Sequence, residues 1–170
     1  RKESSAASDV YKRQERSCTG TSACSFGEPW TDNSDAPGSH NGVDTRSDML
    51  RNLSSPLDPY TGQPLPQQRR QKHIDHLFPL AAAWDLGAAQ WPQRKRTSFA
   101  NDIERNLVVV SGDVNIDKGD STPSEWLPPW KGSQCWYAAR YLTVAIYYQL
   151  AITEADWHAL SGARRLCHRS

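Results

Sequence analysis

An acidic side chain and an imidazole stand next to each other in an apolar stretch of the chain, Ile74-Asp75-His76-Leu77-Phe78-Pro79-Leu80. A histidine, whose ordinary pKa is ~6.5, is a natural general base at neutral pH. A carboxylate beside it suits a hard cation such as Mg²⁺, which prefers oxygen ligands. We therefore expect His76 to act as a catalytic base and Asp75 as a metal ligand.

The elements that carry this pair must bring its two side chains together. If the stretch is a strand, its two-residue period sends Asp75 and His76 to opposite faces. The two side chains can then share a site only where the strand ends or bends. Pro79 fits such an end, because proline cannot donate to a sheet ladder.

A second strand and a helix are predicted further along the chain. The β-branched run at residues 106–110 indicates a strand that opens with Asn106. The turn Ser111-Gly112-Asp113 follows it, and a helix is expected to start within Val114 to Lys118 and to carry Asn115. The order of these elements is strand, strand, helix.

Helical patterns surround this unit, while the N-terminal part lacks them. Residues 1 to about 40 are predicted to be loop or disordered, because they are rich in Ser, Gly and Asp. Within them, residues 1–14 resemble a translated sequencing adapter and are excluded from the fold. The predicted helices cover Asp44 to Leu53, Leu80 to Ala89, Pro92 to Asn101, Cys135 to Leu150 and Thr153 to Cys167, with one turn of helix at Thr122 to Leu127.

Composition limits the class of protein. The chain has 170 residues, of which 37% are hydrophobic and 23% charged, as expected for one globular domain. The net charge of +1 means that any nucleic-acid partner would be held by local patches. No apolar run approaches the ~20 residues that span a bilayer, so we expect no membrane partner. The chain starts at Arg1, and we expect a fragment or a processed chain.

Four cysteines, Cys18, Cys24, Cys135 and Cys167, are scattered along the chain without Cys-x-x-Cys spacing. An even number without that spacing indicates disulfides rather than a zinc site, and hence an exported protein. Three pairings are possible, and we favour Cys135 with Cys167 and Cys18 with Cys24.

Several short motifs, taken in order, resemble the HNH endonuclease family. The nearest branch is that of secreted proteins sharing the nuclease domain found at the C-terminus of GmrSD restriction enzymes. The motifs are Gly42-x-Asp44-Thr45-Arg46, Asp58-Pro59-Tyr60-Thr61-Gly62, Asp75-His76-Leu77-Phe78-Pro79, Phe99-Ala100-Asn101-Asp102, Asn106-Leu107, Asn115-Ile116-Asp117-Lys118-Gly119-Asp120, Trp126-Leu127-Pro128-Pro129 and Cys135-x-Tyr137-x-x-Arg140.

The resemblance implies an α+β fold, with a ββα-metal (HNH, His-Me finger) nuclease core and additional packed helices, over residues 41–167. It implies a metal-dependent endonuclease acting on nucleic acid, with DNA as the expected substrate. Asp75 and Asn115 would hold the metal, Mg²⁺ or else Mn²⁺, and no organic cofactor is expected. His76 would be the general base, oriented by a hydrogen bond from Asn106.

Four basic side chains are expected to contact nucleic acid. Lys118, just beyond the second metal ligand, and Arg140, in the long helix, would bind phosphate by resemblance. Arg94 and Arg96 lie on the surface of the helix predicted from Pro92. Two alternatives stay open: an inactive nucleic-acid-binding module, and an exported structural domain stapled by disulfides.

Overall fold

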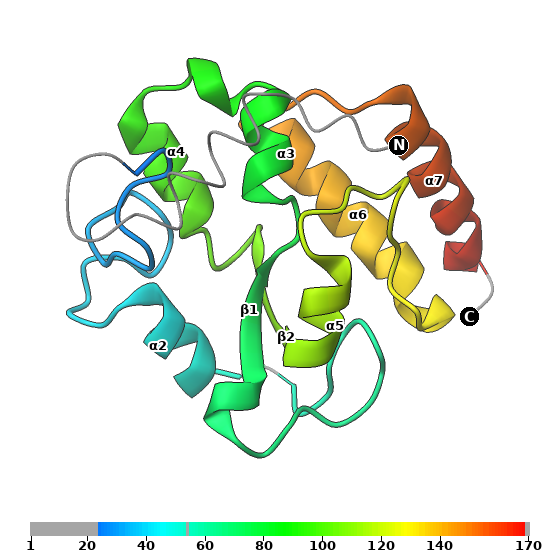
Figure 1. Cartoon of the computed structure of the whole chain (residues 1–170), viewed down its shortest axis with the longest axis horizontal. Coiled ribbons are helices and arrows are strands. Elements are labelled where there is room, and N and C mark those ends of the chain that lie inside the picture. The colour runs from blue at the N-terminus through cyan, green and yellow to red at the C-terminus, as the bar shows by residue number, and fades with distance from the viewer. Residues whose placement is uncertain (1–23, 54, 169–170) are drawn as a thin grey trace.

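The computed structural model describes residues 24–53 and 55–168 and shows an α+β protein (Figure 1). Its elements in chain order are α2 (Thr45–Arg51), η1 (Arg69–Gln71), β1 (Lys72–His76), α3 (Leu80–Asp85), η2 (Ala88–Gln90), α4 (Gln93–Ala100), β2 (Leu107–Ser111), α5 (Gly112–Lys118), α6 (Lys131–Tyr148), α7 (Glu154–Arg164) and η3 (Arg165–His168).

The two strands form an antiparallel pair in which His76 faces Leu107 and Lys72 faces Ser111. β1 ends at His76, three residues before Pro79, as its sequence predicts. α5 follows β2 directly and packs against both strands. The predicted order of strand, strand and helix is therefore confirmed, with α3 and α4 placed between the strands.

Local signals explain where the helices begin. Asp44 caps α2 by accepting a 2.8 Å hydrogen bond from the Ser47 amide, and Thr153 caps α7 through the Asp156 amide at 3.0 Å. The helix predicted from Leu80 is shorter than expected and gives way to η2 after Gly87. At Thr122 to Leu127 the chain makes the one predicted turn, in which the Glu125 and Trp126 amides donate to the Thr122 carbonyl oxygen at 2.9 and 3.0 Å, and it does not continue as a helix.

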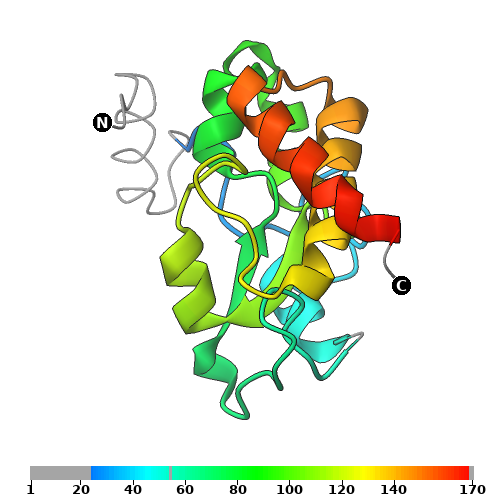
Figure 2. The same cartoon turned by 90° about the vertical axis from the view of Figure 1, so that its right-hand side faces the viewer.

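The C-terminal helices cover one side of the molecule, where α7 lies against α6 (Figure 2). The predicted bridge between Cys135 and Cys167 joins α6 to η3, which follows α7 directly. α6 supplies Tyr137 and Tyr141 to the main core, where Phe78 stacks on Tyr141 with ring centroids 4.5 Å apart. In the described ranges, no helix is both long and apolar enough to cross a membrane.

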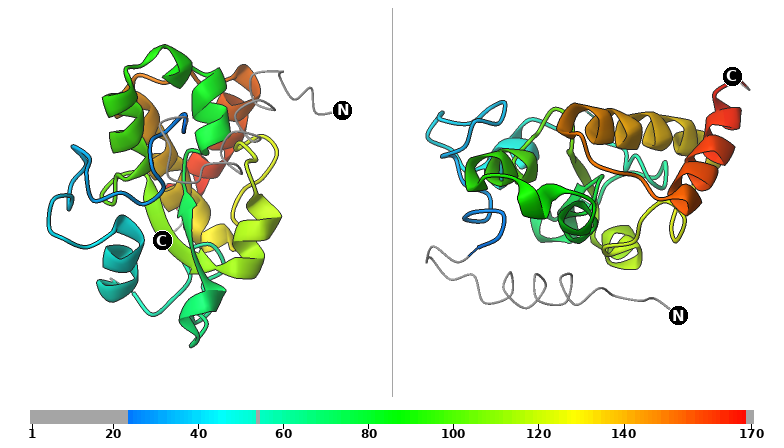
Figure 3. Two further views of the ribbon diagram at one scale, coloured as in Figure 1. Left: turned by 60° about the vertical axis from the view of Figure 1, so that its left-hand side comes forward. Right: turned by 90° about the horizontal axis from the view of Figure 1, so that it is seen from above.

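Residues 24–43 contain no helix or strand, yet they pack onto the folded part, running between α2 and α4 (Figure 3). Phe26 is 4% exposed and packs against Phe99 at 5.9 Å between ring centroids. Cys24 is disulfide-bonded. Its predicted partner, Cys18, lies outside the described residues, as does the segment 1–14.

Candidate active site

Asp75, His76 and Asn115 line one open pocket of about 330 Å³. The pocket lies where β1 ends, against the end of α5 marked by Gly119. Strand alternation still holds: the carboxylate of Asp75 points to α5, whereas the imidazole of His76 points to α4. The two meet at one pocket because β1 stops at His76.

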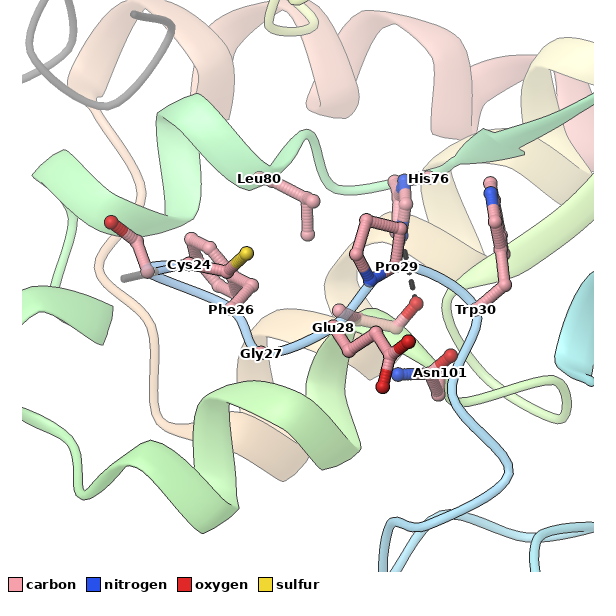
Figure 4. A pocket seen from close by; sticks show the side chains of 11 residues that line it. Cys24, Phe26, Gly27, Glu28, Pro29, Trp30, His76, Leu80 and Asn101 are labelled. Atoms are coloured by element: carbon pink, nitrogen blue, oxygen red, sulfur yellow. Dashed lines mark hydrogen bonds between the residues drawn. The ribbon is translucent and has the colours of Figure 1, made fainter. Parts of the chain in front are cut away.

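The His76 ring is held by a backbone carbonyl and an indole. Its Nε2 lies 2.9 Å from the carbonyl oxygen of Ala100 (Figure 4). Since a carbonyl can only accept, Nε2 carries a proton, and Nδ1 is the basic nitrogen of the neutral ring. Trp30 stacks on the ring, with centroids 5.8 Å apart and planes 18° from parallel.

The surroundings of His76 favour its neutral form. Burial lowers the pKa of His76 below its ordinary 6.5, and the positive charge of Lys118 acts in the same direction. The hydrogen bond to Ala100 and the negative charge of Asp75 raise the pKa, but they do not overcome burial. At neutral pH the ring therefore has a free lone pair on Nδ1.

Asp75 is buried, 5% exposed, and its two oxygens have different partners. Oδ1 accepts a 2.9 Å hydrogen bond from the Lys118 ammonium, and Oδ2 accepts a 2.5 Å hydrogen bond from the Tyr60 hydroxyl. Burial, followed by the charge of Asp75, raises the pKa of Tyr60 well above 10, so this hydroxyl remains a donor. The ammonium also donates to the carbonyl oxygen of His76 at 2.9 Å.

Asn115 lies one helical turn before Lys118 in α5. It faces His73, which is on the same side of β1 as Asp75. Its Nδ2 lies 3.3 Å from Nδ1 of His73. With its amide nitrogen turned to this ring, the side chain has its amide oxygen on the opposite side. Two side-chain contacts therefore join β1 to α5, one between His73 and Asn115 and the other between Asp75 and Lys118.

Asn106 does not bond to His76. Its Oδ1 accepts a 2.9 Å hydrogen bond from the Phe78 amide, and its Nδ2 lies 3.4 Å from the Phe78 carbonyl oxygen. The reason is the register: the Asn106 carbonyl accepts the Leu77 amide at 2.8 Å, so its side chain reaches the next residue along. Asn106 fixes the chain where it leaves β1 and thereby positions His76 indirectly.

Lys118 was expected to contact phosphate, but it is 1% exposed and its ammonium is used by Asp75 and His76. Helical geometry explains this: α5 packs on the sheet through Val114 and Lys118, four residues apart on one face. The ammonium therefore reaches the carboxylate instead of solvent.

The three arginines predicted to contact nucleic acid, Arg94, Arg96 and Arg140, do not line the pocket of His76. Arg94 is exposed and pairs with Asp35, with one hydrogen bond of 2.7 Å. Arg96 is used internally: it donates to the carbonyl oxygens of Ser25 and Trp91 and so holds the segment before α2.

Arg140 lines a separate cavity of about 740 Å³ behind the sheet. Burial lowers its pKa, and its Nε has no hydrogen-bond partner in the described part of the chain. Three carboxylates, those of Asp48, Asp58 and Glu104, line the same cavity. Their charge makes this cavity a poor place for a phosphate.

Two side chains that touch the site were not predicted for it. Trp30 lies in a segment with no periodic pattern, so nothing in its sequence context indicates a role. Tyr60 belongs to the turn Asp58-Pro59-Tyr60-Thr61-Gly62, whose proline and glycine explain the turn but not the tyrosine. A buried aromatic hydroxyl at such a turn is a signal for a polar partner.

The donors near His76 resemble those of a sparse site for a hard cation. No group of three or more His, Cys, Asp or Glu side chains in the described ranges could hold a metal ion. Two carboxylates, from Asp75 and Asp120, and one amide, from Asn115, line the pocket of His76. This donor set suits Mg²⁺, which keeps several waters, better than it suits zinc.

Comparisons with known proteins place the chain in a family. Residues 30–163 match the model of the family described as GmrSD restriction endonucleases, C-terminal domain. An uncharacterized secreted protein of Arthroderma benhamiae is 40% identical over 95 residues, which cover 55% of this chain and 47% of that protein. The chain thus spans about half the length of this relative. No solved structure matches the chain. Because the family model covers most of the chain, the protein belongs to the family of the C-terminal domain of GmrSD restriction endonucleases.

Proposed function

We propose that the protein is an HNH-type, metal-dependent endonuclease that hydrolyses phosphodiester bonds, with DNA as its substrate. The family supports nuclease chemistry. The observation that carries the proposal is the setting of His76, whose Nε2–H is held by Ala100 in the pocket that it shares with Asp75 and Asn115.

His76 acts as the general base in this proposal. Its Nδ1 accepts the proton of a water molecule as that water attacks phosphorus. The lowered pKa keeps the ring unprotonated at neutral pH, and the Ala100 carbonyl stabilises the imidazolium that forms, because Nε2 donates to it in both states. Trp30 limits rotation of the ring by covering one face.

Asp75 and Asn115 would hold the divalent cation, Mg²⁺ or Mn²⁺. An ionised carboxylate has about four lone-pair positions, and Lys118 and Tyr60 use two of those on Asp75. Asp75 therefore has room for a further partner. The Asn115 amide oxygen supplies the second ligand, which is neutral. When bound, such a cation would neutralise charge on the phosphate and on the leaving oxygen.

The other residues around the site take supporting roles. Lys118 and Tyr60 fix the Asp75 carboxylate, and Asn106 fixes the chain after β1. Of the four basic residues predicted to contact nucleic acid, Arg94 is the one whose side chain is largely exposed, at 80%. We propose it as a phosphate contact that would exchange Asp35 for the substrate.

We also propose that the protein is exported. The matched relative is called a secreted protein, and the Cys135–Cys167 bridge is of a kind that persists in oxidising compartments.

The test is nicking of supercoiled plasmid by purified protein with Mg²⁺, with Mn²⁺ and with EDTA. We expect His76→Ala to lower the rate by at least the 10²–10⁴-fold that a general base contributes. His158→Ala is the matched control, because that imidazole is 74% exposed on α7 and does not line the pocket. Equal rates for native protein and His76→Ala would refute the assignment of the base.

The alternatives are separated by measuring DNA binding beside cleavage. DNA binding without cleavage in either metal would favour an inactive binding module, and neither binding nor cleavage would favour a structural domain.

Replacing Asn115 by alanine should raise the Mg²⁺ concentration that gives half-maximal cleavage. Single- and double-stranded DNA and RNA, compared at equal concentration, test the expected preference for DNA.

A further inference from the structure

A second, smaller pocket adjoins His76 on the side of the ring that faces away from Trp30 (Figure 4). Its volume is about 190 Å³, and it shares Trp30, His76 and Leu80 with the pocket of Asp75 and Asn115. Phe26 and Pro29 contribute further apolar surface. The two pockets are therefore neighbours that meet at the proposed base.

The size of this pocket restricts its ligand to about one ring system. An apolar cavity of about 150 Å³ is enough to hold a benzene molecule. Drug-sized ligands occupy pockets of about 300 Å³ or more. A group entering here is thus planar or compact, and it lies within contact of the His76 ring.

Among the described residues that line the pocket, the one carboxylate is that of Glu28, and the Ser25 hydroxyl and the Asn101 amide are further polar groups there. Glu28 places an exposed carboxylate at the rim, next to Asn101 (Figure 4). The side-chain oxygen of Asn101, a wall residue that is 1% exposed, has no hydrogen-bond partner in the described part of the chain. No lysine or arginine lines the pocket. This charge pattern repels a phosphate and favours a neutral group with N–H donors.

We propose that this pocket, called the base pocket below, takes a nucleobase of the substrate strand, next to the phosphodiester that is cut. This inference rests on the proposed nuclease function and adds a preference to it. The base lies among Phe26, Leu80 and the free face of His76, and its amino group donates to Glu28. Adenine, cytosine and guanine carry an exocyclic amine and are therefore preferred to thymine at this position.

Binding is tested with a short oligonucleotide that contains 2-aminopurine, a fluorescent base with an exocyclic amine, in EDTA so that no metal-dependent cleavage occurs. Native protein should quench the fluorescence as the base leaves water and contacts the rings. Leu80→Trp, which fills the base pocket, should abolish the quench. Glu28→Gln should weaken it without affecting folding, because Glu28 is exposed. Glu154→Gln is the control, since that carboxylate is 90% exposed on α7.

Cleavage is tested with oligonucleotides that differ at one position, which holds guanine, thymine or an abasic sugar. Contacts between a base and aromatic side chains change binding by roughly five- to a hundred-fold. We expect kcat/KM for cleavage beside the abasic sugar to be lower than beside guanine by that factor. The kcat/KM beside thymine should lie between these two values. Glu28→Gln should reduce the difference in kcat/KM between the oligonucleotides that hold guanine and thymine.

Failure of the base pocket and failure of the nuclease function give different results. Metal-dependent cleavage that is equal beside a base and beside an abasic sugar would overturn the base pocket and leave the nuclease function standing. Quenching that Leu80→Trp abolishes, with no cleavage by native protein, would keep the base pocket and overturn the function. Quenching that neither variant changes would overturn the base pocket.

Discussion

Replacing Lys118 by methionine should destabilise the protein strongly, because its ammonium is the buried counterion of Asp75. The Lys118 side chain is 0% exposed and that of Asp75 is 6% exposed, and their charged atoms are 2.9 Å apart. Methionine fills most of the same space but removes two hydrogen bonds, those to Asp75 and to the carbonyl oxygen of His76. The loss therefore reports the charge rather than a cavity.

The size of the effect follows from what is left behind. Removing one partner of a buried ion pair typically costs about 3–5 kcal/mol, because the other charge stays buried without compensation. Asp75 keeps its hydrogen bond to Tyr60 and lines an open pocket, so we expect the lower end, about 3 kcal/mol. For a chain of this length, that loss lowers Tm by roughly 6–12 °C.

The measurement is urea unfolding followed by tryptophan fluorescence, with the disulfides kept oxidised. Lys131→Met, at an exposed position, is the control and should change the free energy of unfolding by less than about 0.5 kcal/mol. Adding Asp75→Asn to Lys118→Met should recover part of the loss, because no ion is then buried alone. A loss below about 1 kcal/mol for Lys118→Met would refute the reasoning, since that is the range of exposed pairs.

Four further predictions concern the base and the covalent bridge. Cleavage should rise with pH through the pKa of His76 and persist below pH 6.5, the ordinary value, because burial lowers this pKa. For the same reason, the contribution of His76 to stability is complete above about pH 6.5 and is lost as pH falls through its lowered pKa, which urea unfolding across pH would show. Trp30→Ala should raise the pKa of His76 toward 6.5 by admitting water, and Trp30→Phe should restore it, as measured by NMR titration of the ring. Replacing Cys135 and Cys167 by serine should lower the free energy of unfolding by about 3–4 kcal/mol, given the 32-residue separation, and leave kcat unchanged because neither residue lines the pocket.

The parts of the fold that the sequence predicts are those set by local chemistry. Asp44 caps α2 because its side chain reaches an amide three residues away. The β-branched run forms β2, and the termination of β1 at His76 follows from the residues just after it. The Cys135–Cys167 bridge belongs to one of the three possible pairings, and it forms where η3, after α7, packs on α6.

The environment of the site depended on contacts between distant segments. Trp30 reaches His76 from a segment without periodicity, and Tyr60 reaches Asp75 across a turn and the following loop. The position of Lys118 followed from the packing of α5, which sequence spacing alone did not specify. Residue types near the site were therefore predictable, whereas their partners were not.

The connection between β1 and β2 also has a consequence for the order of folding. The strands are not joined by a hairpin: α3, η2 and α4 all lie between His76 and Leu107. Pairing them directly from an extended chain would first require closing that long loop, at a cost in chain entropy that no early contact repays. Helices that form inside the loop shorten it. We therefore expect amide protection in α3 and α4 to precede protection in the sheet, so that the chain gains a folded scaffold before it gains a working site.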